Sequence, residues 1–113
     1  MEALFEKIKS YVKMDTEISA EEFQAYYKSV MDKLTAAYDG MSERELLQGK
    51  MITSILSANA GTRGKRKNTD AKKFRKRQEK SQFWSDAIAY RLKKSWLSED
   101  EISEKTAALE EEM

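Results

Sequence analysis

Residues 19–38 read SAEEFQAYYKSVMDKLTAAY, and this stretch decides the fold class. Its large apolar and aromatic residues recur every three or four positions, the spacing that gathers them on one face of an α-helix. That face comprises Phe23, Tyr26, Tyr27, Val30, Met31, Leu34, Ala37 and Tyr38. Polar residues occupy the opposite face, so the pattern predicts a helix over 20–38 with one side buried.

The start of this helix carries a signal that occurs three times in the chain. A serine stands three residues before a glutamate, which predicts a capping box that satisfies backbone donors the helix cannot satisfy itself. The pairs are Ser19 with Glu22, Ser42 with Glu45, and Ser98 with Glu101. An apolar residue before each serine can pack against another inside the helix and fix the entry of the chain. Three such helix starts favour an all-α protein.

The remaining pattern extends this prediction to the whole chain, which has 113 residues, enough for a single domain. Valine occurs twice and proline is absent, so strands are disfavoured and long helices are allowed. We expect a small all-α bundle of four to five helices with one long, partly projecting basic helix. The helices are predicted over 2–14, 20–38, 43–58, 69–96 and 99–113, within a single domain divided into a helical core (1–61), a basic Gly-containing loop (62–68), a long helix (69–97) and an acidic C-terminal helix or tail (98–113).

Glycines supply the expected ends of two helices. Gly40 follows the second predicted helix and is placed to close it in a left-handed cap. Gly61 stands in the same relation to the third, and with Gly64 it predicts a flexible loop over 59–68. The segment between about Leu34 and Ser57 is interpreted as an ordinary helical hairpin. A helix-turn-helix reader of DNA is a weaker interpretation of it, because its second helix offers few phosphate contacts.

Composition excludes several classes of function. Cysteine and histidine are both absent, which removes disulfides, thiol nucleophiles, the common zinc ligands and the commonest general base. We predict no catalytic residue, no metal site and no cofactor. An enzyme would require Tyr26, Tyr38 and Lys50 to meet carboxylates in one cleft. No apolar stretch approaches the roughly 20 residues that span a membrane, and the acidic N-terminus is unlike a signal peptide, so a cytoplasmic location is expected.

The segment RGKRKNTDAKKFRKRQEK, residues 63–80, departs from the rest of the chain. The whole protein has a net charge of only +1, yet ten basic and two acidic residues give this segment +8. The basic residues are Arg63, Lys65, Arg66, Lys67, Lys72, Lys73, Arg75, Lys76, Arg77 and Lys80. The stretch 99–113 has a local charge of −6, so opposite charges are concentrated in different parts of one small protein.

Like charge held together costs stability, and a bound polyanion removes that cost while its counterions are released. We therefore predict that the ten basic residues bind nucleic acid, DNA or RNA, through its phosphates. Stacking on single strands is disfavoured, because Phe74 is the only aromatic residue within residues 63–80. An acidic protein surface, or the protein's own acidic tail, is the alternative partner, in which case the chain would be an adaptor or assembly protein. A merely solvated surface also remains open, and a membrane partner is not expected.

Aromatic residues downstream of the basic run suggest self-association. The second half of the fourth helix carries apolar side chains on two flanks, whereas packing within one bundle needs a single stripe. We predict a homo-oligomer whose interface comprises Phe83, Trp84, Ala87, Tyr90 and Trp96.

Overall fold

The computed structural model describes residues 1–14, 16–66, 70–95 and 97–112, and over these ranges it contains five α-helices and no strand. The all-α bundle is therefore confirmed. The helices are α1 (Glu2–Val12), α2 (Ala20–Ala37), α3 (Glu43–Gly64), α4 (Ala71–Lys94) and α5 (Glu99–Glu111), with a short 3₁₀ turn, η1 (Tyr38–Gly40), after α2. The molecule measures 43 × 25 × 25 Å, so its long dimension is little more than the length of α4.

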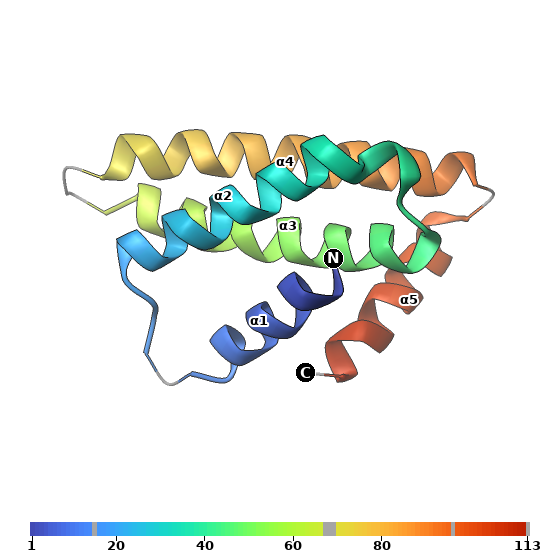
Figure 1. Ribbon diagram of the computed structural model, residues 1–113, viewed down its shortest axis with the longest axis horizontal. Helices are drawn as coiled ribbons and strands as arrows, with labels where there is room; N and C mark the ends of the chain where they lie inside the picture. The colour runs from blue at the N-terminus through green and yellow to red at the C-terminus, as the bar shows by residue number, and fades with distance from the viewer. Residues whose placement is uncertain (15, 67–69, 96, 113) are drawn as a thin grey trace.

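The helices are organised around the antiparallel pair formed by α3 and α4, which lie side by side over most of their length (Figure 1). Helix α2 runs over this pair and contacts it through large aromatic side chains: Phe23 packs edge-on against Phe74 with ring centroids 5.2 Å apart, and Tyr38 does so against Trp84 at 5.3 Å. The shorter helices α1 and α5 pack against α3 from the other side. Helix α3 is consequently the centre of the bundle, and its predicted inward residues Leu47 and Met51 are buried.

Glycine allows α3 and α4 to approach closely. A Cβ atom added at Gly64 would lie 2.8 Å from Cγ of Arg75, and one added at Gly49 would lie 3.2 Å from Cδ1 of Ile88. At Gly61 the added atom would lie 2.8 Å from the amide nitrogen of Gln78. The prediction that Gly61 ends the third helix is therefore wrong: α3 continues through Gly61, which packs against Gln78 of α4, and ends at Gly64.

Polar side chains complete the same interface. The hydroxyl of Ser85, which is fully buried, accepts a hydrogen bond of 2.8 Å from Nζ of Lys50 and lies 3.1 Å from the hydroxyl of Ser54. Farther along, the hydroxyl of Ser57 donates to Oε1 of Gln82 over 3.0 Å. Small hydroxyl side chains thus keep the helices close while satisfying each other's hydrogen bonds.

The longer α3 changes the expected position of the basic segment. Residues 59–64 were predicted as loop but belong to α3, so the N-terminal half of α4 packs beside helix. Ala71 and Phe74 are buried there, with Phe74 only 3 % exposed. The basic half of α4 therefore does not extend beyond the body alone, and its outer face is what remains in solvent (Figure 1).

The ends of the helices agree only in part with prediction. Ser42 and Ser98 form complete capping boxes, whereas Ser19 accepts a hydrogen bond from the Glu22 amide without the reciprocal bond. The left-handed cap expected at Gly40 is wrong. Instead, the guanidinium of Arg91 on α4 donates to the carbonyls of Tyr38 and Asp39, and so satisfies acceptors at the end of α2 from another helix.

Burial along α4 predicts that two substitutions on this helix change the free energy of unfolding by very different amounts. Ile88→Ala removes a fully buried side chain from the α3–α4 interface and should lower the free energy of unfolding by about 2–5 kcal/mol. Phe83→Ala, on the exposed side of the same helix, should change it by less than about 1 kcal/mol. Urea denaturation followed by circular dichroism measures both. Equal losses would contradict the packing described.

Candidate nucleic-acid interface

Five cationic side chains of the predicted site lie exposed on the N-terminal half of α4. These residues, Lys72, Lys73, Arg75, Lys76 and Lys80, are called the basic face below. Within the described parts of the chain, no carboxylate lies at ion-pair distance from any of them. One of the five has a hydrogen bond to the protein, from Nη1 of Arg75 to the Gly64 carbonyl over 3.3 Å. Lys65, just after α3, is also exposed.

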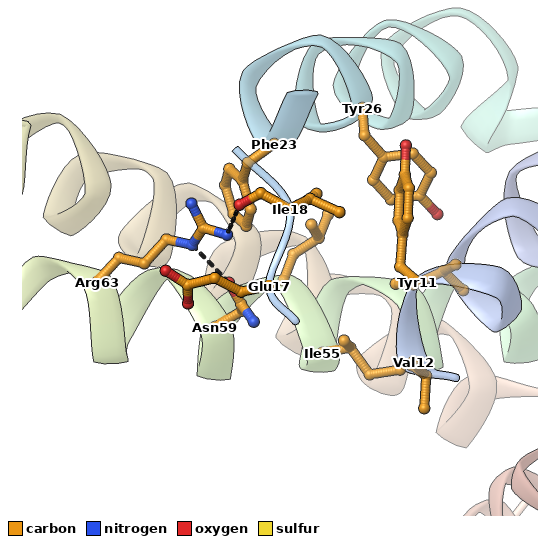
Figure 2. Close-up of a pocket in the computed structure, with 11 residues that line it drawn as sticks. Tyr11, Val12, Glu17, Ile18, Phe23, Tyr26, Ile55, Asn59 and Arg63 are labelled. Carbon is orange, nitrogen blue, oxygen red and sulfur yellow. Dashed lines mark hydrogen bonds between the residues drawn. The ribbon is translucent and has the colours of Figure 1, made fainter. Parts of the chain in front are cut away.

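Arg63 is not part of this surface, contrary to the prediction, because only 4 % of it is exposed. Its Nε donates to Oδ1 of Asn59 over 2.9 Å, and its Nη2 donates to the Ile18 carbonyl over 2.6 Å (Figure 2). The guanidinium also lies against two rings, 5.0 Å from the centroid of Phe23 and 5.3 Å from that of Phe74. Burial lowers the pKa of Arg63, but a guanidinium stays charged in proteins. Arg63 therefore anchors α2 and the preceding loop to α3 and α4.

Other basic residues of the predicted site make contacts within the protein. Arg66 makes a bidentate ion pair with the carboxylate of Glu17, in which Nη2 lies 2.9 Å from Oε2. The hydrogen bond from Arg66 holds the pKa of Glu17 below its ordinary value, while burial opposes this shift slightly. Arg77 is half-buried and stacks over Phe74, its guanidinium carbon 4.8 Å from the ring centroid. Lys67 lies outside the described residues.

The acidic helix α5 does not cover the basic face. It packs near the C-terminal end of α4 and the N-terminal end of α3, whereas the basic face lies at the opposite end of α4 (Figure 1). Its ion pairs are made there: Glu99 with Lys93 at 2.6 Å, and Glu112 with Arg44 at 3.7 Å. The alternative in which the protein's own tail neutralises the cations within one molecule is therefore wrong. The two charged regions remain separated.

The start of α4 adds positive potential to the same region. Among the described helices, α4 alone has no acidic residue in its first turn, and Lys72 and Lys73 stand there instead. Cations near the positive end of a helix dipole destabilise the helix, whereas a bound anion stabilises it. Asp70 at the N-cap position places one carboxylate at this end, so the electrostatic cost of the two lysines is offset in part within the chain.

The predicted oligomer interface does not form one continuous surface. Trp84 is half-buried against Tyr38, and the carbonyl of Ala87 accepts a hydrogen bond of 3.1 Å from the Tyr38 hydroxyl, so both residues contribute to the packing of α2 on α4. Phe83 and Tyr90, by contrast, are 64 % and 63 % exposed. Trp96 lies outside the described residues. Sequence reasoning did not link the two exposed aromatic residues to the basic residues upstream.

The side chains that an enzyme would need do not converge. The hydroxyl of Tyr26 donates to the Leu4 carbonyl over 2.7 Å, and burial raises its pKa, while Tyr38 and Lys50 are bonded to α4 at other places. A cavity of about 110 Å³ lies between α1, the loop before α2, and α3, and its lining is mainly apolar (Figure 2). In the described ranges, no group of three or more acidic residues is arranged to hold a metal ion, and no helix is long and apolar enough to cross a membrane.

Comparison with known proteins assigns no family: no family model matches the chain, and neither the curated proteins nor the solved structures gave a match. The site is therefore interpreted from its own residues.

The buried position of Arg63 predicts that lysine cannot replace it. Arg63→Lys loses the planar group that contacts two rings and donates to both Asn59 and Ile18, so the free energy of unfolding should fall by about 1–3 kcal/mol. The matched change Arg75→Lys on the exposed face should cost less than about 0.5 kcal/mol. Urea denaturation of both variants provides the test, and an equal effect at the two positions would rule out the anchoring role.

The ion pair of Glu17 predicts a pH-dependent contribution to stability. Because the folded-state pKa of Glu17 is lowered from 4.5, the contribution is complete above that pH and is lost as the pH falls through the folded-state pKa. The wild-type protein should be more stable than Glu17→Gln at neutral pH, and the difference should vanish in strong acid. Thermal denaturation across this range measures it. In an Arg66→Gln background, the same substitution should have no comparable pH dependence.

Proposed function

We propose that this protein is a non-enzymatic nucleic-acid-binding protein that contacts the phosphate backbone through the basic face of α4. The observation that carries the proposal is the exposure of five cations on one half of a helix, with no carboxylate at ion-pair distance in the described structure. Polyanions bind such surfaces because counterions are released when phosphates are neutralised.

The spacing of the lysines supports contact with a linear polyanion. Lys72, Lys76 and Lys80 follow one another at intervals of four residues, so they form a row along α4 with steps of about 6 Å. Lys73 and Arg75 flank this row on either side. Phosphate contacts position a protein without reading bases, so we expect little sequence preference. The contribution of Arg63 to binding is withdrawn from the proposal because its guanidinium is buried.

A second candidate is an assembly protein whose basic face docks an acidic protein surface. The observation that favours it is that α5 lies away from the basic face and carries the exposed acids Asp100, Glu104, Glu110 and Glu111, for which the described structure gives no ion pair. Copies arranged head to tail would bring α5 of one molecule to the basic face of the next. This arrangement would form an open chain of molecules, whereas nucleic-acid binding requires only one copy.

Salt dependence tests the first candidate. Binding of a labelled oligonucleotide, measured by fluorescence anisotropy between low and physiological salt, should weaken steeply as salt increases. Replacing Lys72, Lys73, Lys76 and Lys80 with Gln removes four phosphate contacts, and the slope of log K against log salt should become shallower by about three. The variant Lys7→Gln/Lys13→Gln/Lys28→Gln/Lys33→Gln removes the same charge from α1 and α2 and their flank, and should keep most of the slope.

No binding at low salt, or an equal loss in both quadruple variants, would contradict the proposal. Light scattering then tests the assembly candidate. Head-to-tail association predicts a molecular mass that rises with concentration in the wild-type protein, and that falls to the monomer value when Asp100 and Glu104 are replaced by Asn and Gln and both Glu110 and Glu111 by Gln. A wild-type protein that is monomeric at all concentrations would exclude it.

A further inference from the structure

The outer side of α4 carries more than cations. Positions separated by steps of three or four residues lie on the same side of a helix. On α4 such steps connect a set of residues that we call the outer line: Lys72, Lys76, Lys80, Phe83, Ala87, Tyr90 and Lys94. The exposed acids Glu79 and Asp86 lie beside this line, next to Phe83. The line is about 33 Å long and continues the lysine row of the basic face directly into two exposed aromatic side chains.

The aromatic residues on this line are held in place by neighbours yet remain open to solvent. The Phe83 ring packs edge-on against Trp84, with centroids 5.9 Å apart, and Trp84 itself packs against Tyr38 of η1. Nζ of Lys94 lies 4.9 Å from the centroid of the Tyr90 ring. Most of the surface of both Phe83 and Tyr90 is accessible. Lys94 covers part of the Tyr90 ring, and the remaining exposed surface of both rings can be reached by a planar group from outside.

Charge on the same line argues against a second copy as the occupant. In a parallel arrangement of two α4 helices, each lysine of the line would meet its own counterpart. In an antiparallel arrangement centred on Ala87, Lys80 would meet Lys94. Both arrangements place like charges opposite each other, which opposes association. A polyanion with exposed planar groups meets the cations and the rings of the line together, and it passes the carboxylates of Glu79 and Asp86, which lie beside Phe83.

We propose that the ligand of the basic face is single-stranded nucleic acid, whose phosphates follow Lys72, Lys76 and Lys80 while its bases stack on Phe83 and Tyr90. This inference rests on the proposed function and specifies its ligand. In a duplex the bases are already stacked and paired, so exposed rings on one helix gain little from it, whereas unpaired bases stack readily on aromatic side chains. At 3.4 Å per nucleotide, the line accommodates roughly ten nucleotides of a stacked strand.

The sequence alone argued against stacking because Phe74 is the only aromatic residue between Arg63 and Lys80. The structure shows different aromatic residues beside the lysines. Phe74 is buried against Phe23 and cannot stack on a base, but Phe83 and Tyr90, downstream of the basic run, lie on the line of the lysines. The aromatic residues that this inference uses, Phe83 and Tyr90, are residues that the sequence predicts in an oligomer interface.

The experiment compares a labelled 12-nucleotide single strand of mixed sequence with its duplex, by fluorescence anisotropy at fixed low salt. Phe83→Ala/Tyr90→Ala should lower the affinity for the single strand by about tenfold or more, since stacking contributes about 1–3 kcal/mol per base. The affinity of the same double variant for the duplex should differ from that of the wild-type protein by less than about twofold. The slope of log K against log salt should stay as in the wild type, because no phosphate contact is removed.

Two matched variants make the result specific. Val12→Ala/Met14→Ala removes exposed apolar side chains from the end of α1 and should leave single-strand affinity unchanged. Phe83→Tyr/Tyr90→Phe keeps both rings and should also retain it. Circular dichroism confirms that each variant is folded before binding is measured.

The outcomes separate this inference from the function on which it rests. If the wild-type protein binds neither oligonucleotide, the proposed function fails and the inference fails with it. If it binds both with the same affinity and the alanine variant changes neither, the function stands and the stacking inference is overturned. If the alanine variant instead lowers the oligomeric state measured by light scattering, the line is an interface between copies, and the inference is again overturned.

Discussion

The close approach of α3 and α4 is the constraint on which the rest of this structure depends. Glycines at positions 49, 61 and 64 leave room for side chains of α4 that a Cβ atom would displace, and the hydroxyls of Ser54 and Ser85 meet across the same interface. Because this pair is close-packed along its length, α2 must lie over it at a greater distance, where aromatic side chains fill the space. The pairing also fixes which side of α4 is buried. It turns Phe74, Ser85 and Ile88 inward and leaves the lysines of the basic face, Phe83 and Tyr90 outward, together with the acids Glu79 and Asp86.

Electrostatic separation follows from that same pairing. Helix α5 leaves the C-terminal end of α4 and folds back against α3, so its carboxylates stay far from the basic face at the other end. Within the described structure, the ion pairs of α5 and of Glu17 neutralise other cations and leave the five residues of the basic face exposed. A protein of nearly zero net charge thereby presents strongly charged ends. Such a distribution does not stabilise the fold, and it is the physical reason for inferring an external anionic partner.

Most of the fold could be predicted from sequence, because helix periodicity and capping are local properties. The helix starts after Ser19, Ser42 and Ser98 are correct, since each depends on contacts within one turn. The errors arise where distant residues decide. Gly61 has the chemistry of a helix end, but α4 lies against it, and Arg63 has the chemistry of a phosphate ligand, but Phe23 and Phe74 enclose it. Likewise, a left-handed cap is expected at Gly40, but Arg91 donates there instead to the carbonyl of Asp39, 52 residues away along the chain. The α4 lysines of the candidate site are exposed, as their sequence context indicates, and their role in binding stays a prediction.

The central claim is that the outer line of α4, from Lys72 to Lys94, is a continuous binding surface for single-stranded nucleic acid. The most direct measurement is a nuclear magnetic resonance titration of ¹⁵N-labelled protein with an unlabelled single-stranded oligonucleotide. The account predicts that amide shift changes are concentrated on α4, with the side-chain resonances of Phe83 and Tyr90 shifting toward lower frequency as bases stack on them. Changes centred on α1 or α5, or none at low salt, would contradict it.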